Sequence, residues 1–381
     1  MKARLGDVCT VVSGSTPKST VPEYWDGDIK WITPAELSND TCIINDSARH
    51  ITALGVAKTG LKPFPAGTVI LSSRAPIGKT AIAGCEMFCN QGFKNLICSE
   101  KIDSKYLYYF LSGKTDYLNS LGRGATFKEI SKAIVENIEI PLPEVEEQKR
   151  IAARFERLLR LIQLQKAELE ELDKLVKSRF IELFGTETEF DKWPCCTIGD
   201  VADVCVGVVI KPTQYYTDTG IPAFRSLNIG EMHVKDSDWV YFTEEGHQKN
   251  QKSVVHKNDV LVVRSGAPGT ACVATEKYDG YNAVDIIIAH PDNSKVNSIF
   301  LAAFTNMPHG MNQIRERTGG AAQQHFNVGG YKAMRLIMPS IELQNQYAAF
   351  VEQTDKSKLA VQTGLQELEI LKKSLMQQYF G

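Results

Sequence analysis

The sequence lacks the long hydrophobic run that a membrane-spanning helix needs. No stretch of about 20 apolar residues occurs in its 381 residues. The first ten residues, MKARLGDVCT, also lack the apolar core of a signal peptide. These two absences predict a soluble protein that resides in the cytoplasm.

Regularly spaced cysteines and histidines are missing as well. The nine cysteines are an odd number in a large chain, which argues against a disulfide framework and favours buried, reduced thiols. Cys85 and Cys89 are four residues apart, and Cys195 adjoins Cys196, but no matching Cys/His pair follows either of them. The seven histidines are scattered without metal-ligand spacing. We therefore predict no metal site.

Neither sign of charge is in excess. The formal net charge is −2, and no segment shows the strong basic surplus that a free-standing DNA-binding protein carries. A nucleic-acid-binding role therefore requires that other subunits supply most of the phosphate contacts.

Catalytic motifs are absent too. The chain has no Gly-rich dinucleotide fingerprint, no Asn-Pro-Pro-Tyr or Asp-Pro-Pro-Tyr of amino-methyltransferases, and no G-x-S-x-G elbow. The stretch SRAPIGKT (73–80) ends as a phosphate-binding loop does, but Ser73 replaces its first glycine and no crossover helix follows. We interpret it as a β-turn with a basic tip, with a nucleotide-hydrolysing enzyme as an alternative. No catalytic residue is predicted.

What the chain does contain is two long amphipathic segments, 143–185 and 339–381. Apolar residues recur in each at alternating steps of four and three, the spacing of a helix seam that meets a partner helix. Each segment begins with a proline and ends with Phe-Gly. A helix of about 40 residues is roughly 60 Å long, too long to be buried in one domain, so we predict an antiparallel coiled coil between the two segments. The predicted apolar seam consists of Ile151, Phe155, Leu158, Ile162, Leu169, Leu172, Val176, Leu183, Tyr347, Val351, Val361, Leu365, Leu368, Leu375 and Tyr379.

The remaining sequence is an internal tandem repeat with an offset of roughly 195 residues, too long for a solenoid. LGDV (5–8) recurs as IGDV (198–201), and GTVILSSRAPIG recurs as NDVLVVRSGAPG. This order predicts an α+β protein of two similar mixed α/β domains, related by a pseudo-two-fold axis and separated by the helices. The predicted borders are 1–142 for the first domain, 143–185 for the central helix, 186–338 for the second domain and 339–381 for the C-terminal helix.

Both predicted domains carry polar, glycine-rich loops at matching places. These are SGSTPKST, SRAPIGK, CNQGFK and GRGATFK in the first, and VIKPTQYY, FRSLN, RSGAPG and GGAAQQHF in the second. Arg, Lys, Asn and Gln are the side chains that read base edges, whereas Ser, Thr and loop N–H groups suit phosphates. The loops are therefore the candidate binding elements.

The whole pattern resembles the specificity subunit of type I restriction–modification systems. LGDV with SGSTP, the strand and loop GTVILSSRAPIGK, NQGFKNL, the junction IPLPEVEEQKRIA and the helix ending in Phe-Gly carry the resemblance, in order along essentially the full chain. It implies that each domain is a target recognition domain reading one half of a bipartite, asymmetric double-stranded DNA site. The helix pair would space the half-sites and dock two modification subunits.

The same resemblance implies which chemistry lies in partners. A modification subunit would hold S-adenosylmethionine and methylate adenine at N6, and a motor/nuclease restriction subunit would use ATP and Mg²⁺, while this chain would hold no cofactor. A duplicated protein-binding adaptor on a coiled-coil spacer, without DNA binding, is the alternative that the neutral charge allows.

Transferring the resemblance to the loops gives a set of candidate DNA contacts. We expect the arginines at 74, 225 and 264 to reach base edges and the lysines to reach phosphates. The second copy departs from the first in having VGVVIKPT in place of the SGSTP loop. The candidate contacts are Lys18, Arg74, Lys79, Asn90, Gln91, Arg123, Lys128, Lys211, Gln214, Arg225, Asn228, Arg264, Gln323, Gln324 and His325.

Overall fold

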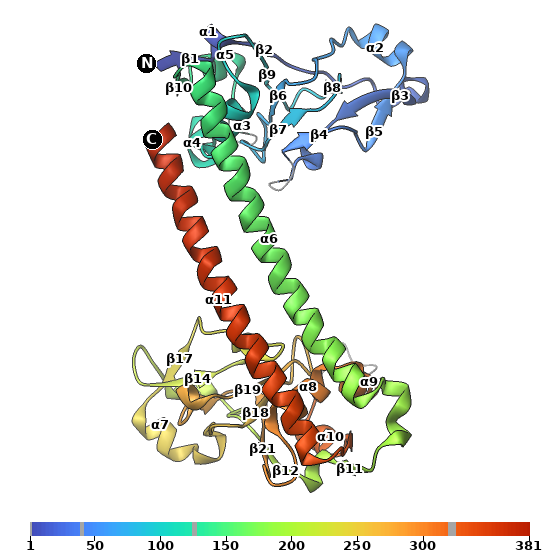
Figure 1. Cartoon of the computed structure of the whole chain (residues 1–381), viewed down its shortest axis with the longest axis vertical. Coiled ribbons are helices and arrows are strands. Elements are labelled where there is room, and N and C mark those ends of the chain that lie inside the picture. Colours follow the sequence, from blue (N-terminus) through green and yellow to red (C-terminus); the bar gives the residue numbers. More distant parts are fainter. Residues whose placement is uncertain (1, 39–41, 124–127, 319–324) are drawn as a thin grey trace. The chain divides into compact units, whose positions relative to one another are not determined.

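A computed structural model describes residues 2–38, 42–123, 128–318 and 325–381 (Figure 1). The chain forms two compact units: unit 1 comprises residues 1–166 and 363–381, and unit 2 comprises residues 167–362. The borders of both units fall inside the two long helices, α6 (Val145–Phe184) and α11 (Ile341–Phe380). Among the described residues, no helix has the length and apolar character needed to cross a membrane.

Unit 1 is a mixed α/β fold built on two sheets. Its larger sheet has the strand order β2-β9-β6-β7-β4, its smaller sheet the order β5-β3-β8, and β1 pairs with β10. The strands are β1 (Lys2–Arg4), β2 (Cys9–Val12), β3 (Trp25–Ile32), β4 (Ile43–Ile44), β5 (Arg49–Ile51), β6 (Val69–Leu71), β7 (Thr80–Ala83), β8 (Phe88–Cys89), β9 (Asn95–Cys98) and β10 (Glu139–Pro141). The helices are α1 (Leu5–Val8), α2 (Ala53–Thr59), α3 (Ser104–Ser112), α4 (Thr115–Leu121) and α5 (Lys132–Glu136), with parts of α6 (Val145–Phe184) and α11 (Ile341–Phe380).

Unit 2 is also a mixed α/β fold, built on two four-stranded sheets and two two-stranded pairs. Its strands are β11 (Cys195–Thr197), β12 (Ala202–Val206), β13 (Tyr216–Thr217), β14 (Ile221–Phe224), β15 (Ile229–Gly230), β16 (His233–Val234), β17 (Val240–Phe242), β18 (Val260–Val263), β19 (Ala271–Val273), β20 (Asn282–Ala283), β21 (Ile286–Pro291) and β22 (Arg335–Ile337). Its short helices are α7 (Glu244–Lys249), α8 (Ser298–Asn306), α9 (Pro308–Thr318) and α10 (Val328–Lys332). The remaining parts of α6 and α11 complete the unit.

The predicted duplication is confirmed by sheet topology. The order β12-β21-β18-β19 in unit 2 matches β2-β9-β6-β7 in unit 1. In each unit the first strand pairs antiparallel with the strand before a long helix, β1 with β10 and β11 with β22. The apolar runs predicted as buried strands form β6 and β18, whose side chains are all at most 2 % exposed. Residues 103–121, DSKYLYYFLSGKTDYLNSL, have the sequence pattern of one helix, but they form two helices, α3 and α4, separated by Gly113 and Lys114.

A buried glutamine fixes the start of each long helix. In unit 1 the Gln148 amide donates to the Pro143 carbonyl at 2.8 Å, and its oxygen accepts from the Asp103 N–H at 2.9 Å. In unit 2 Gln344 makes the same bonds at 2.9 Å each, to the Pro339 carbonyl and from the Asn297 N–H. Both glutamine side chains are fully buried. The first turn of each long helix is therefore bonded to the start of α3 or α8, the helix that covers the sheet.

Every apolar residue of the predicted seam is buried or partly buried. In unit 1, Phe155 of α6 stacks on Phe380 of α11 with ring centroids 5.7 Å apart. In unit 2, Phe180 of α6 packs against Tyr347 of α11 at 5.4 Å, and one seam lysine, Lys358, forms an ion pair with Asp173 at 2.7 Å. Contacts of 180 with 347 and of 173 with 358 mean that the helices run antiparallel. The exposed apolar side chains of these helices lie off the seam: Leu161, Leu164, Leu175, Ile181, Leu359, Ile370 and Leu371.

Replacing Phe180 by Ala is expected to lower the free energy of unfolding of unit 2 by about 3–5 kcal/mol, the usual cost of removing a buried aromatic ring. Phe180 is fully buried among Phe184, Phe300 and Tyr347. Its neighbour Ile181 is 42 % exposed, so Ile181→Ala should cost less than about 1 kcal/mol. Urea unfolding followed by circular dichroism measures both variants. Equal losses in the two variants would contradict the seam.

Replacing Gln344 by Ala is expected to destabilise unit 2 by about 1–3 kcal/mol, because it leaves the buried Asn297 N–H and Pro339 carbonyl without their partner. The exposed Gln346, two residues further along the same helix, provides the control, and Gln346→Ala should change stability by less than about 0.5 kcal/mol. Thermal unfolding of both variants measures the difference. If Gln344→Ala unfolds at the same temperature as Gln346→Ala, the buried amide does not anchor the helix.

Candidate nucleic-acid interface

Three candidate loops of unit 1 are bonded to one another, and the segment that follows the fourth is bonded to one of them. The Ser15 N–H in SGSTPKST donates to the Cys89 carbonyl at 3.0 Å, which connects the first loop to CNQGFK. The Ser73 N–H in SRAPIGK donates to the Gly92 carbonyl at 2.8 Å, and the Ile130 N–H donates to the Ser73 carbonyl at 2.9 Å. Backbone bonds therefore hold three of the loops and residue 130 together, as a binding surface requires.

Two indole rings and a glycine position the first loop. The Trp31 Nε1–H donates to the Ser15 carbonyl at 3.0 Å, and the Trp25 Nε1–H donates to the Lys18 carbonyl at 3.2 Å. At Gly14 a Cβ would lie 1.9 Å from the Cys89 carbonyl oxygen, so only glycine fits. Gly207 occupies the same place in unit 2, where a Cβ would lie 2.5 Å from the Ala283 oxygen. The two entry loops, which the sequence showed as different, therefore share their point of contact with the sheet.

A charge cluster lies where SRAPIGK meets the loop before α5. The Glu129 carboxylate accepts from Arg74 Nε at 2.9 Å and from Lys94 Nζ at 3.1 Å. Burial opposes ionisation of Glu129, but the hydrogen bonds and charges of Lys94 and Arg74 outweigh it and hold the pKa of this carboxyl below its ordinary value. The Arg74 side chain is 45 % exposed and its ion pair uses Nε. The geometry thus orients a guanidinium whose Nη–H groups suit bidentate contacts with a base or phosphate.

Unit 2 has the same junction with different side chains. The Phe326 N–H donates to the Arg264 carbonyl at 3.0 Å, as Ile130 does to Ser73 in unit 1. One residue away, the Ser265 hydroxyl and His325 Nδ1 are 2.7 Å apart, in the place of the pair formed by Arg74 and Glu129. The backbone is therefore repeated, whereas the exposed pair changes from arginine and glutamate to serine and histidine.

Some of the predicted contact residues have exposed side chains, whereas others have side chains that already form hydrogen bonds or ion pairs within their unit. Arg225 and Arg264 are partly buried: Arg225 donates to the Asp238 carbonyl, and Arg264 forms an ion pair with Asp285 at 2.6 Å and donates to the Phe326 carbonyl at 3.1 Å. Gln323 and Gln324 lie outside the described residues. The exposed candidates are Lys18, Arg74, Gln91, Arg123, Lys128, Lys211, Gln214 and His325.

Three predicted contacts are occupied by the fold itself. Asn228 is fully buried; its oxygen accepts from the Arg225 N–H at 2.9 Å and its amide donates to the Ser237 carbonyl at 2.7 Å. Lys79 Nζ donates to the Leu37 carbonyl at 2.8 Å, and the Asn90 oxygen accepts from the Gly92 N–H at 2.8 Å. Through these bonds the three side chains stabilise the loop backbone.

Sequence reasoning missed other members of the interface. Lys94 and Glu129 join loops far apart in the chain, and no local pattern pairs them. Lys235 is another missed cation: with FRSLN and RSGAPG residues it lines a cavity of about 400 Å³ in unit 2. Its position after the short hairpin β15–β16 brings it beside both loops, which the sequence does not indicate.

The stretch SRAPIGKT is a turn between strands. The Lys79 N–H donates to the Ser72 hydroxyl at 2.9 Å, and strand β7 begins at Thr80, where a phosphate-binding loop would begin a helix. The predicted β-turn is confirmed. In the described part of the chain, no group of three or more His, Cys, Asp or Glu side chains is arranged to hold a metal.

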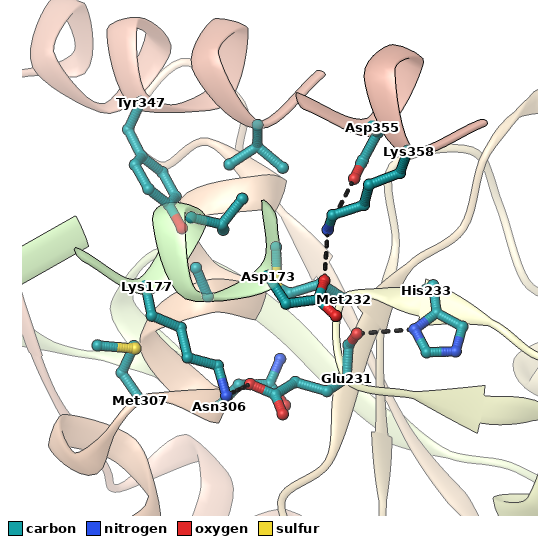
Figure 2. A pocket seen from close by; sticks show the side chains of 13 residues that line it. Asp173, Lys177, Glu231, Met232, His233, Asn306, Met307, Tyr347, Asp355 and Lys358 are labelled. Atoms are coloured by element: carbon teal, nitrogen blue, oxygen red, sulfur yellow. Dashed lines mark hydrogen bonds and ion pairs between the residues drawn. The ribbon is translucent and has the colours of Figure 1, made fainter. Parts of the chain in front are cut away.

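A second cavity of unit 2, of about 230 Å³, lies between the long helices, α8 and the β15–β16 hairpin (Figure 2). Its charged groups pair with one another, Lys358 with Asp173 at 2.7 Å and Lys177 with Glu231 at 2.8 Å. Glu231 and His233 line this cavity and also the cavity beside the loops. The hairpin therefore connects the loop cluster of unit 2 to its helix pair.

Known proteins share this fold and sequence pattern. The family model described as type I restriction modification DNA specificity domain matches residues 1–174. The type I restriction enzyme MjaIX specificity subunit of Methanocaldococcus jannaschii is 28 % identical over 92 % of this chain and 85 % of its own length. The EcoprrI specificity subunit of Escherichia coli is 22 % identical over 92 % of this chain and 86 % of its own.

Two solved structures agree in fold. The S subunit of a type I restriction–modification system from M. genitalium has a TM-score of 0.60 at 16 % identity, over 100 % of this chain and 96 % of that one. A chain from a study of assembly and conformational transition in the type I system has a TM-score of 0.65 at 18 % identity, over 100 % and 97 %. Residues 1–174 therefore match the type I restriction modification DNA specificity domain, and the whole chain shares its fold with specificity subunits of type I restriction–modification systems.

Proposed function

We propose that each unit reads one half of a bipartite, asymmetric DNA site through its loop cluster. The observation that carries this proposal is the repeated junction with changed side chains. In unit 1 it presents Arg74 beside Glu129, and in unit 2 it presents Ser265 beside His325. An identical backbone would meet DNA in the same way, while different donors and acceptors would select different bases.

The chemistry of each junction suggests what it reads. Arginine pairs bidentately with guanine O6 and N7, and Glu129 holds the Arg74 side chain ready for such a contact. Serine and histidine offer single donors or acceptors, so the unit 2 junction would accept a wider range of bases. Arg264 would then act by positioning the loop of residues 264–269, because Asp285 and the Phe326 carbonyl hold its guanidinium.

The long helices would connect the two recognition units. We propose that α6 and α11, which extend through both units, set the spacing between the half-sites and dock two modification subunits. The methyl donor S-adenosylmethionine would lie in those partners, and ATP with Mg²⁺ in a restriction subunit. The name of each curated relative above describes a specificity subunit of a restriction enzyme, which supports this division of labour.

The isolated chain is expected to bind DNA weakly and in a salt-sensitive manner. Its net charge of −2 provides few phosphate contacts of its own. Because phosphate neutralisation sets the slope of affinity against salt, adding the modification subunits should raise both the affinity and that slope. Fluorescence anisotropy of a labelled duplex at 50 and 200 mM salt, with and without the partner, measures this; nanomolar binding by the chain alone at physiological salt would contradict it.

Single replacements in the two junctions are expected to relax one half-site each. Loss of one bidentate base contact costs about 1–3 kcal/mol of discrimination, so Arg74→Ala should admit other bases in one half of the target and leave the other half unchanged. His325→Ala and Arg264→Ala should relax only the opposite half. Mapping methylated adenines across the genome of cells expressing each variant with its partners measures the change.

A charge-matched control separates base reading from general electrostatics. Lys101 is exposed, and its carbonyl accepts from Gln148 at the helix start, away from the loops. Lys101→Ala should therefore leave the methylated sequence unchanged. If Arg74→Ala and His325→Ala relax the same half-site, or if neither alters the sequence, the assignment of one half-site to each unit is wrong.

A further inference from the structure

Three strands of unit 2 place a cysteine, a histidine and an aspartate in one row. Strand β21 lies between β12 and β18. Cys205 pairs with Ile288 across β12 and β21, so His290, two residues further along, lies on the same face. Asp259 comes just before Val260, which pairs with Ala289, so it lies opposite His290 on the other side. The register thus places Asp203 directly opposite His290 in β12, Cys205 diagonally next to it, and Asp259 opposite it on the side of β18.

The distances show contacts of His290 with Asp259 and Cys205. His290 Nδ1 is 2.7 Å from Asp259 Oδ1, and His290 Nε2 is 3.6 Å from Cys205 Sγ. The Asp259 side chain is 4 % exposed, and its other oxygen accepts from the His256 N–H at 2.6 Å, which fixes its orientation. Cys205 is partly buried, and His290 is 31 % exposed. A thiol, an imidazole and an orienting carboxylate in this order are the elements of an activated nucleophile.

The hydrogen bonds of His290 favour its protonated form. The hydrogen bond to Asp259, followed by that to Cys205, raises the pKa of His290 to about 10. The ring is then protonated at neutral pH, so Nδ1–H donates to Asp259 and Nε2–H donates to the sulfur. The geometry therefore places a proton donor beside the Cys205 sulfur. In the neutral form the thiol donates instead to the Lys252 carbonyl, 3.1 Å away.

Unit 1 shows that the shared fold does not require this row. Its sheet has the same order, and the register places Val12, Ile97 and Thr68 at the corresponding positions. Val12 and Ile97 pack against an apolar core there. Thr68 donates its N–H to Pro65, three residues earlier, as Asp259 does to His256. The polar row is therefore specific to unit 2.

Other thiols of the chain lack this arrangement. Burial raises the pKa of Cys89 and of Cys272 to about 12, so both resist ionisation. Cys196 is partly buried like Cys205, but burial and then the charge of Asp200 raise its pKa. Cys196 therefore provides an internal reference in the same unit.

We propose that Cys205 is a reactive thiol that hydrogen peroxide oxidises to a sulfenic acid. The thiolate sulfur attacks one peroxide oxygen, an S–O bond forms and the O–O bond breaks. Sulfur is oxidised and peroxide is reduced; the leaving hydroxide takes the Nε2 proton of His290 and departs as water. The net reaction of one thiol and one peroxide gives one sulfenic acid and one water. Asp259 is a positioning residue that acts through His290.

The test is oxidation of the full-length chain by dilute hydrogen peroxide with dimedone present to trap sulfenic acid. Peptide mass spectrometry then gives a labelling rate for each cysteine. Cys205 should be labelled at least tenfold faster than Cys196. His290→Gln should reduce the Cys205 rate to that of Cys196 while leaving the Cys196 rate unchanged, and Asp259→Asn, which keeps the side-chain volume, should reduce it several-fold.

Unit 1 offers a matched control. Val12→Cys places a thiol at the corresponding position without a histidine or an aspartate beside it, so it should react no faster than Cys196. If the thiol at position 12 reacts as fast as Cys205, exposure alone explains the reactivity and the proposal is wrong. It is also wrong if His290→Gln and Asp259→Asn both leave the Cys205 rate unchanged in folded protein, or if Cys205 reacts no faster than Cys196. These measurements need no DNA and are independent of the proposed recognition function.

Discussion

The structure depends on where each long helix begins. A tilt of the first turn would redirect the axis of a 40-residue helix along its whole length. The position of that first turn must therefore be fixed. Gln148 and Gln344 fix it, because each buried amide bonds at once to the proline carbonyl before the helix and to the start of the helix that covers the sheet. A buried amide that lost one of these bonds would keep its desolvation cost, which makes the position intolerant of other residues. Helix and recognition fold are thereby combined in one rigid element in each unit.

That constraint explains how much the sequence could predict. The two helices, their seams and the repeated strands were predicted from apolar spacing, because burial acts on periodic patterns that a single sequence displays. The repeat strengthened each assignment, since two weak matches in the same order support one fold. One detail was lost: Gly113 and Lys114 divide the stretch 103–121 into two helices. That break depends on tertiary packing, which local periodicity does not contain.

The candidate site could be predicted only at the level of loops. Residue type indicated which stretches were polar, but not whether a side chain was already engaged. Asn228 and Lys79 have the chemistry of base or phosphate contacts, yet their groups satisfy loop carbonyls and N–H groups. Conversely, Glu129 looked unremarkable and yet orients Arg74. Hydrogen-bond partners far apart in sequence decide between these roles, and only the folded chain brings them together.

The same reasoning shows why the two units could diverge in chemistry without diverging in fold. Backbone bonds, such as those from Ile130 to Ser73 and from Phe326 to Arg264, hold the loops whatever side chains flank them. The flanking pair is then free to change from arginine and glutamate to serine and histidine. The sheet follows the same rule: valine, isoleucine and threonine in unit 1 are replaced by cysteine, histidine and aspartate in unit 2 at the corresponding positions. A scaffold whose order comes from main-chain bonds and buried glutamines thus leaves its surface positions open to new chemistry.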